Sequence, residues 1–323
     1  MILIVSIRDD LHALQVRRTL IERGHPCEIL ECDQVSRSSR LRFSIDQFST
    51  TSLLHLEDGT VVDVESVEVL WWRRVRADQL LDDDQENRHV ADLINNDCRG
   101  AIAGILDWAF KGAWVSKPDA TDRAGNKIFQ LAVAQSCGFR VPDTLVSQSM
   151  QEVKSFAEGR RVIVKPVVGA AGPLLFTQFL DDPESLSLQS YRRAPAIYQE
   201  YIPGDRHIRL NCFGDQSVAV VIETSDLDWR PNLKVPIRRW EVPGHLHKQI
   251  RAVLDKLGLA MGIVDLKLTP AGEIVWLEVN PQGQFLFLEA LAKLPLTELF
   301  SDYLLSLTRT GLAFPGMGAV QNS

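Results

Sequence analysis

The sequence predicts an α/β segment followed by an α+β segment. The chain opens with a strand–helix–strand pattern, and its second half shows the signals of antiparallel strand pairs. Hydrophobic residues make up 45% and charged residues 24% of the 323 residues, which is the balance of an ordinary globular protein. A chain of this length holds one large domain or two to three packed ones.

The first third of the chain is predicted to begin as a β-α-β unit. We expect strands over 2–7, 26–31 and 67–72, a hairpin over 40–63, and helices over 11–23 and 85–110. Asp9 or Asp10 can cap the first helix and Gly24 ends it. The segment 57–60 has the composition of the hairpin turn. The acidic run 82–84 indicates a solvated helix start more than a metal site.

The remainder is predicted to be a linker followed by mixed helices and strands. The segment 114–119 ends at a proline region and is predicted to be the linker. We expect helices over 123–137, 149–157, 244–257 and 284–309, a polar loop over 225–236, and strands over 144–147, 162–165, 174–179, 196–201, 207–213, 217–223, 262–269 and 273–279.

Composition excludes several classes of protein. Lys plus Arg number 35 and Asp plus Glu 42, so the net charge of −7 argues against a general nucleic-acid-binding surface. No apolar run reaches the roughly 18–20 residues that cross a bilayer. The apolar start lacks the features of a signal peptide and is predicted to be a strand. Five scattered cysteines without a C-x-x-C pair indicate free thiols and a cytoplasmic protein.

A lysine followed by a loop of small residues indicates an anion site. The sequence has neither G-x-x-x-x-G-K-[ST] nor an opening G-x-G-x-x-G. Lys165 instead ends the apolar strand V-I-V-K-P, and the loop 168–173, with Gly169 and Gly172, follows at once. Backbone N–H groups of such a loop can approach a phosphate beside the ammonium group. The alternative is an ordinary lysine at a strand end, followed by a turn.

Three oxygen-bearing side chains form a candidate magnesium site. Glu278 and Asn280 are two residues apart on a predicted strand, so their side chains face the same side, and Asp265 on the preceding strand can face them. Two carboxylates and an amide oxygen suit Mg²⁺ when phosphate oxygens complete its shell. A solvated sheet face is the alternative, which the strongly apolar strands disfavour because unpaired acids there are costly.

Two further features suit a nucleotide and an anion. The apolar strand over 196–201 runs into a proline–glycine turn, and such a segment can pair its exposed backbone with a purine edge. Arg209 on the next strand and Arg230 in the polar loop are candidate anion clamps. Taken alone, the strand is weak evidence, and an arginine at either position is more often a surface charge.

Together these segments resemble the ATP-grasp ligases over roughly residues 114–310. Lys127 in N-K-I-F-Q-L and Lys165 match the two nucleotide lysines of that superfamily. Glu200, Tyr201 and Ile202 match the segment between the lobes that holds adenine. The resemblance implies ATP as a substrate of a fold in which two lobes grip the nucleotide.

The same resemblance covers the candidate metal site. Asp265 stands in the D-x-K setting of the superfamily, and Glu278 and Asn280 stand in its E-x-N-P setting. The resemblance implies that these three residues bind Mg²⁺, with two ions expected. It also implies that Arg209 and Arg230 act on the reacting acyl phosphate.

A narrower likeness points to the macrocyclases that mature microviridins and related graspetides. The motifs are the opening M-I-L-I-V with D-D, the segment W-R-R at 72–74, D-W-R at 228–230 and N-P-Q-G-Q-F at 280–285. The likeness implies a pre-ATP-grasp α/β domain over 1–115, a central lobe over 116–202 and a C-terminal lobe over 203–323. It also implies a homodimer.

The macrocyclases join Asp or Glu side chains of a precursor peptide, made of leader and core, to Ser, Thr or Lys side chains. The resemblance therefore implies an ATP-dependent ligase that releases ADP and phosphate. Two alternatives stay open: an ATP-grasp ligase that adds an amino acid to a protein tail or small acid, and a non-catalytic relic that binds nucleotide or peptide. One departure is His207, which stands where the superfamily usually has an acid, two positions before Arg209.

Overall fold

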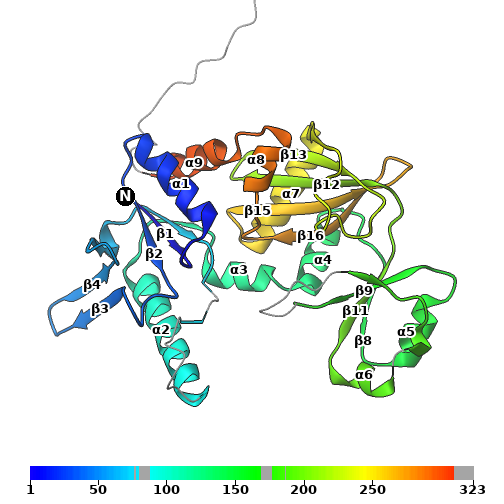
Figure 1. Ribbon diagram of the computed structural model, residues 1–323, viewed down its shortest axis with the longest axis horizontal. Coiled ribbons are helices and arrows are strands. Elements are labelled where there is room, and N and C mark those ends of the chain that lie inside the picture. Colours follow the sequence, from blue (N-terminus) through cyan, green and yellow to red (C-terminus); the bar gives the residue numbers. More distant parts are fainter. Residues whose placement is uncertain (76–77, 80–87, 169–176, 186, 309–323) are drawn as a thin grey trace, which may run out of the picture. The chain divides into compact units, whose positions relative to one another are not determined.

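The computed structural model describes residues 1–308 apart from 76–77, 80–87, 169–176 and 186 (Figure 1). The chain forms two compact units. Unit 1 comprises Met1–Lys117 and the residues from Pro295 on, and unit 2 comprises Pro118–Leu294. Within the described chain, no helix is both long and apolar enough to span a bilayer. The acidic run 82–84 lies outside the described residues.

Unit 1 is built on a four-stranded parallel sheet with the order β2-β1-β6-β7. Its strands are β1 (Ile2–Ser6), β2 (Cys27–Glu31), β6 (Val69–Trp72) and β7 (Ala113–Val115). The predicted β-α-β start is confirmed, because α1 (Leu11–Glu22) joins β1 to β2 and the side chain of Asp10 caps it. The linker predicted over 114–119 is wrong, since Trp114 and Val115 belong to β7 and pair with β6.

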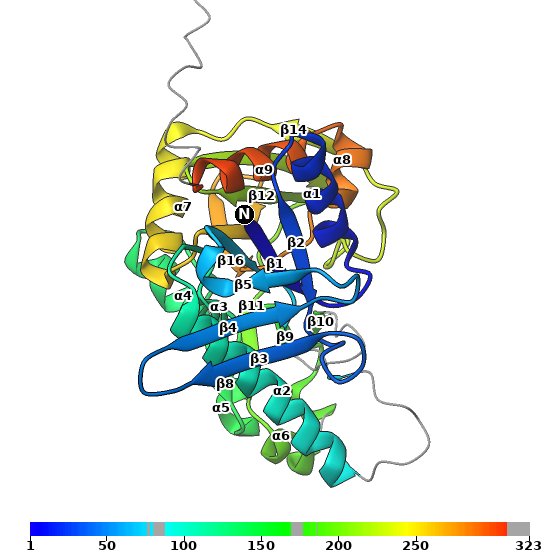
Figure 2. The same cartoon turned by 90° about the vertical axis from the view of Figure 1, so that its left-hand side faces the viewer.

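A second sheet of unit 1 is antiparallel, with the order β3-β4-β5, and Figure 2 shows its three strands side by side. Its elements are β3 (Arg40–Ile45), β4 (Thr50–His55), β5 (Val61–Asp63) and the short helix η1 (Val64–Ser66). The single hairpin predicted over 40–63 is therefore incomplete. A second turn precedes β4, and the carboxylate of Asp46 stabilises it by accepting from the backbone N–H groups of Phe48 and Ser49.

The last helix of the chain belongs to unit 1. Helix α9 (Leu296–Ser306) packs beside α1, as Figure 1 shows. The ring of Phe300 lies edge-on to Trp71, with 4.6 Å between ring centroids, and both side chains are buried. Arg23, directly after α1, pairs with Asp302 at 2.6 Å. The described residues after Leu294 thus belong to unit 1, and the C-terminal lobe expected over 203–323 stays a prediction.

Unit 2 contains two antiparallel sheets. The first has the order β10-β9-β11-β8 and packs against two short helices through Val153, Val162, Tyr191 and Tyr198. Its elements are β8 (Thr144–Ser147), α5 (Met150–Ala157), β9 (Val162–Pro166), β10 (Gln178–Phe179), η2 (Pro183–Ser185), α6 (Leu188–Arg193) and β11 (Ala196–Glu200). The predicted boundary between 202 and 203 falls between this sheet and the next, and the division into two lobes stays a prediction.

The second sheet of unit 2 has five strands in the order β14-β13-β12-β15-β16. Its strands are β12 (Arg206–Phe213), β13 (Gln216–Glu223), β14 (Ile237–Trp240), β15 (Met261–Leu268) and β16 (Ile274–Asn280). Alternate residues point to opposite faces of a strand. On β12 and β15, one set of alternate side chains is apolar and packs on helices: Ile208, Leu210, Cys212, Val264 and Leu266. The other set carries polar and charged groups.

Helices cover the apolar face of the five-stranded sheet. They are α3 (Pro118–Ala124), α4 (Lys127–Ser136) and α7 (Gly244–Leu257), and α8 (Leu286–Ala292) follows the last strand. The one helix predicted over 123–137 is two, because Asn126 interrupts it and caps α4. The one predicted over 284–309 is also two, separated by Lys293 with φ of +55° and by Pro295. The sequence does not predict strand β14, because the two arginines between Ile237 and Trp240 interrupt the apolar pattern that is typical of a strand.

Replacement of Phe300 by alanine tests the assignment of α9 to unit 1. We expect Phe300→Ala to lower the free energy of unfolding by about 3–5 kcal/mol, since it removes a fully buried ring that contacts Trp71. Calorimetry with Trp fluorescence measures this loss. The control is Phe48→Ala, whose ring is 88% exposed. Equal stability of the two variants would contradict the packing.

Candidate functional site

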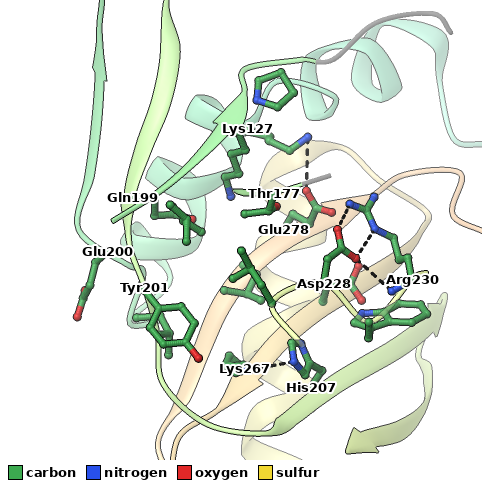
Figure 3. Close-up of a pocket in the computed structure, with 18 residues that line it drawn as sticks. Lys127, Thr177, Gln199, Glu200, Tyr201, His207, Asp228, Arg230, Lys267 and Glu278 are labelled. Carbon is green, nitrogen blue, oxygen red and sulfur yellow. Dashed lines mark hydrogen bonds and ion pairs between the residues drawn. The ribbon is translucent and has the colours of Figure 1, made fainter. Parts of the chain in front are cut away.

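A pocket in unit 2 opens between the four-stranded sheet and the charged face of the five-stranded sheet. Figure 3 shows the side chains that line it converging from β9, β11, β12, β15, β16 and the loop before β14. The apolar part of the lining includes Ile163, Ile202, Leu227 and Leu277. The polar part is rich in charged groups of both signs.

Two acids face each other across neighbouring strands in this pocket. Asp265 on β15 is the cross-strand partner of Glu278 on β16. The register then shifts, because Leu266 pairs with Trp276 and Leu277 is the extra residue of a β-bulge. Such a bulge re-aims a side chain. As a result, the successive residues Leu277 and Glu278 both line the pocket, whereas Trp276 and Val279 lie in the core.

Each of the two acids has a cationic partner. Arg209 donates from Nη1 to both carboxylate oxygens of Asp265, at 2.9 and 2.8 Å, and from Nη2 to the carbonyl of Gln284 at 2.9 Å. The Nζ of Lys127 lies 3.4 Å from Oε2 of Glu278. Both contacts place positive charge beside partly buried carboxylates, since the side chains of Asp265 and Glu278 are 17% and 32% exposed.

The pKa values of the two acids move in opposite directions. Removal from water raises the pKa of Asp265, and the nearby Glu278 adds to this, although Arg209 opposes it. Removal from water also acts to raise the pKa of Glu278, but Lys127, Lys165 and Arg230 outweigh it and hold that pKa below its usual value. Nearby cations therefore stabilise the ionised forms of both acids.

The two predicted nucleotide lysines come together in the pocket. Lys127 is the first residue of α4, which begins there because the side chain of Asn126 accepts from the N–H groups of Ile128 and Phe129. Lys165 is the fourth residue of β9 and pairs with Ile197 of β11. Burial lowers the pKa of Lys165 to about 8; Glu278 opposes this shift and Lys127 adds to it.

The segment predicted to hold a base borders the same pocket. Glu200, Tyr201 and Ile202 all line it. The carboxylate of Glu200, however, turns away from the other lining residues (Figure 3), pairs with Arg140 at 3.3 Å and accepts from the N–H of Asp143. A ligand in the pocket would therefore meet the backbone of this segment and not that carboxylate.

The loop before β14 brings a second arginine to the pocket. Arg230 donates from Nε to Asp228 at 2.8 Å and also pairs with it through Nη2. Trp229 stacks on Phe287 with 5.8 Å between ring centroids, and the guanidinium of Arg209 lies 5.3 Å from the Trp229 ring. These contacts fix the loop to the charged face of the sheet.

His207 and Lys267 form a pair between β12 and β15, where they are cross-strand partners. The ring Nε2 of His207 lies 2.7 Å from the Nζ of Lys267, and both residues are buried. Burial and the positive charge of Lys267 lower the pKa of His207 to about 4. Burial also lowers the pKa of Lys267 to about 8, although Asp205 opposes the shift.

Most of the predicted site residues are near one another. Those that line the pocket are Lys127, Lys165, Glu200, Tyr201, Ile202, Arg230, Asp265 and Glu278. Arg209 lies behind Asp265 and orients it, so direct contact with a substrate stays a prediction. Asn280 does not line the pocket, and its side-chain oxygen accepts from the N–H of Gln282. Gly169 and Gly172 lie outside the described residues.

Several lining residues were not singled out from the sequence. Lys267 follows Asp265 by two residues, so the period of a strand places it on the same face. Thr177 and Gln199 also line the pocket. Gln199 is held by a hydrogen bond to Thr144 at 2.8 Å, and no local sequence pattern marks it.

The donors in the pocket suit a magnesium ion bound together with phosphate. Within the described ranges, no group of three or more His, Cys, Asp or Glu side chains is placed to hold a metal ion. Asp265 and Glu278 nevertheless present facing carboxylates, and Mg²⁺ is commonly bound by one or two carboxylates plus substrate phosphates. The residues present therefore fit an ion whose other ligands are phosphate oxygens and water.

Comparison with solved structures identifies the fold. Macrocyclase MdnC from Microcystis aeruginosa MRC, solved with its precursor peptide MdnA, matches with a TM-score of 0.84 over 94% of this chain and 98% of that chain, at 24% identity. The chain has the ATP-grasp fold. A RiPP-associated ATP-grasp ligase from Chryseobacterium gregarium, solved with ADP and a leader and core peptide, matches with a TM-score of 0.83, covering 94% and 96% of the two chains at 22% identity.

One sequence relative matches a smaller part of the chain. The α-aminoadipate–LysW ligase LysX of Sulfurisphaera tokodaii is 28% identical over 118 residues, or 33% of this chain. Those residues span 41% of LysX, so the chain matches about two fifths of the length of this curated relative. No family model matches the chain. The resemblance found in the sequence is thus confirmed for the fold.

The buried His207 makes the stability of the protein depend on pH. Its pKa is about 4 in the native state and 6.5 when unperturbed, so between these values the unfolded state binds more protons. Stability is therefore lost as the pH falls from 6.5 towards 4, by on the order of 2 kcal/mol at pH 5. We expect His207→Gln to lose correspondingly less between pH 7 and pH 5. Urea unfolding at both pH values measures this, and equal losses would contradict the assignment.

Proposed function

We propose that the protein is an ATP-dependent carboxylate ligase, and that the pocket of unit 2 is its active site. The observation that carries the proposal is the facing pair Asp265 and Glu278, with two lysines beside it in one pocket. This combination supplies positive charge for phosphates and oxygen ligands for a divalent ion. The ATP-grasp fold supports the same assignment.

We assign one part of the pocket to the purine base of ATP and another part to its phosphates. The backbone of 200–202 would receive the purine, since the carboxylate of Glu200 is held outside by Arg140. Lys127 and Lys165 would bind the phosphates. Asp265 and Glu278, with Asn280 as the predicted third ligand, would hold Mg²⁺, for which two ions are expected. When bound, the metal would offset negative charge on the phosphate oxygens.

The reaction solves the problem that a carboxylate is a poor acyl donor, since its leaving group would be oxide. In the first step, a carboxylate oxygen of the substrate forms a bond to the γ-phosphorus of ATP while the bond to ADP breaks. A hydroxyl or amine then attacks the acyl carbon and phosphate leaves, while the nucleophile gives up its proton. Arg230, with Arg209 behind Asp265, would stabilise the charge on the acyl phosphate.

We propose that the substrate is a ribosomal precursor peptide with a leader and a core. The MdnC and Chryseobacterium gregarium structures support this, since the first was solved with a precursor peptide and the second with a leader and core peptide. The product would then carry an ester or amide between an Asp or Glu side chain and a Ser, Thr or Lys side chain. The homodimer and the cytoplasmic location stay predictions.

The second candidate is an amide ligase that adds an amino acid to a protein tail or small acid. The match to LysX favours it, because the name of that protein describes a ligase of α-aminoadipate and LysW. The whole-chain similarity to the macrocyclase favours the first candidate, because it covers 94% of the chain and not 33%. If the protein binds nucleotide but forms no ADP with any substrate, the third alternative holds, namely a non-catalytic protein that binds nucleotide or peptide.

Removal of one charge from the acid pair tests the metal assignment. We expect Asp265→Asn and Glu278→Gln each to lower the rate of ADP formation by at least about a hundredfold, since charge on the transferring phosphoryl group would be less well neutralised. A coupled ADP assay over a range of MgCl₂ concentrations measures the rate. Asp255→Asn is the matched control, because that acid pairs with Arg251 on the surface of α7. Full activity of the two pocket variants would end the assignment.

Mass spectrometry distinguishes the candidate reactions. The protein is incubated with ATP, MgCl₂ and a synthetic candidate precursor peptide that has a leader and a core rich in Ser, Thr, Asp and Glu. Macrocyclisation lowers the peptide mass by one water for each bond, together with one ADP per bond. A core with every Asp and Glu replaced by Asn and Gln is the control and should stay unchanged. A gain in mass by ligation of a free amino acid would favour the amide ligase instead.

A further inference from the structure

The edge strand β14 of the five-stranded sheet is a feature that the proposed reaction does not use. Among the described strands, β14 pairs with β13 alone. The N–H of Glu223 donates to the carbonyl of Pro236 at 3.0 Å, which fixes the alternation of hydrogen-bonded pairs along these two strands. The backbone N–H and C=O groups of Ile237 and Arg239 therefore point away from β13, towards the open side of β14.

These outward backbone groups form an edge to which another strand can add. Within the described ranges, no backbone hydrogen bond is found at Ile237 or Arg239 on this side. An exposed edge is a template for an extended peptide, whose main-chain hydrogen bonds then supply affinity. Because β14 has four residues, the segment that adds to it is short as well.

Arg239 brings a cation to this edge, on the face of the sheet that lines the pocket. It lies opposite Val220, and Val220 lies opposite Arg209. Arg209 in turn lies opposite Asp265, so these side chains form one row across the sheet. At about 4.8 Å for each strand, Arg239 lies about 14 Å from Asp265 along this row. Trp240, the next residue, packs on the other face against the helices.

The acids near β14 do not neutralise Arg239. Its side chain is exposed, and no ion pair joins it to an acid of the described chain. Arg238 pairs instead with Glu223. Helix α8 also lies near β14, but its Glu289 forms no ion pair with Arg239. Glu241, directly after the strand, is exposed, so an acid of a bound segment is best placed beside Arg239 and away from Glu241.

We propose that an extended segment of the peptide substrate adds to the edge of β14 as a sixth strand, with an Asp or Glu side chain beside Arg239. The inference rests on the proposed function, since it concerns the peptide of that reaction. The loop 225–236 carries Arg230 in the pocket and runs directly into β14, so a peptide on the edge can continue into the pocket. At about 3.3 Å per residue, at least about four residues separate the acid beside Arg239 from the acid that reacts.

Peptide affinity measured without ATP tests the addition of a strand. Fluorescence anisotropy follows binding of the labelled synthetic precursor peptide, with its leader and its core rich in Ser, Thr, Asp and Glu. We expect Ile237→Pro to weaken binding about tenfold or more, because it removes an outward N–H and keeps the ladder to β13. Ile45→Pro is the matched control, because that isoleucine faces outward on β3, the edge strand of another sheet in unit 1.

Two further sets of measurements separate the backbone contribution from the charge. Peptides with one backbone N-methyl group at alternate residues of a short segment should bind more weakly, whereas methylation of the residues between should have no effect. Arg239→Glu should weaken binding about tenfold or more, and a peptide in which one acid is replaced by arginine should restore it. Arg238→Glu is the control, since that side chain lies on the opposite face.

The possible results separate this inference from the proposed function. Equal peptide affinity of Ile237→Pro and Ile45→Pro overturns it, as does unchanged affinity of Arg239→Glu. If the unaltered protein joins the peptide with loss of water while the edge variants bind it fully, the ligase assignment stands and the docking site fails. If the edge variants lose the peptide but no bond forms with ATP, the docking site stands and the ligase assignment fails. If the unaltered protein does not bind the peptide, both are overturned. Circular dichroism and unchanged ATP affinity show that the variants are folded.

Discussion

The approach of two carboxylates, Asp265 and Glu278, across neighbouring strands is the constraint on which the rest of unit 2 depends. Two like charges held together and partly removed from water are unfavourable unless cations surround them. The fold supplies these cations from separate elements: Lys127 from the first turn of α4, Lys165 from β9 and Arg209 from β12. The pocket is therefore an electrostatic arrangement in which each element contributes one charge.

The five-stranded sheet can hold these charges because one of its faces packs on helices and the other lines the pocket. Alternate residues of β12 and β15 pack on helices, so the strands are anchored independently of the charged groups on their other face. The bulge at Leu277 breaks the alternation on β16 and brings two successive side chains to the pocket. Because alternate residues of a strand point to opposite faces, the residues that stabilise the sheet are different from those that line the pocket.

Sequence reasoning succeeded where a local pattern determines the structure. The β-α-β start, the strand pair that carries Asp265 and Glu278, and the strand before Lys165 all follow from apolar runs and their turns. The sequence does not predict features that depend on tertiary contacts. Strand β7 is three residues long and exists because β6 offers it a partner, and Glu200 turns outward because Arg140 is there to bind it. Neither partner is adjacent in the sequence.

The same limit applies to the pair of His207 and Lys267. The sequence shows a histidine where an acid is usual, but only the register of β12 and β15 shows that the histidine faces a lysine. The two residues that pair are 60 positions apart in the chain.

The position of α9 has a consequence for dissecting the protein into parts. Because the chain enters unit 2 at Pro118 and returns to unit 1 at Pro295, unit 2 is an insertion within unit 1. A fragment that stops at Lys117 would lack Phe300 and expose the Trp71 surface that it covers. We expect such a fragment to aggregate through that apolar surface, whereas a polypeptide in which a linker joins residue 117 to 295 would keep both halves of unit 1.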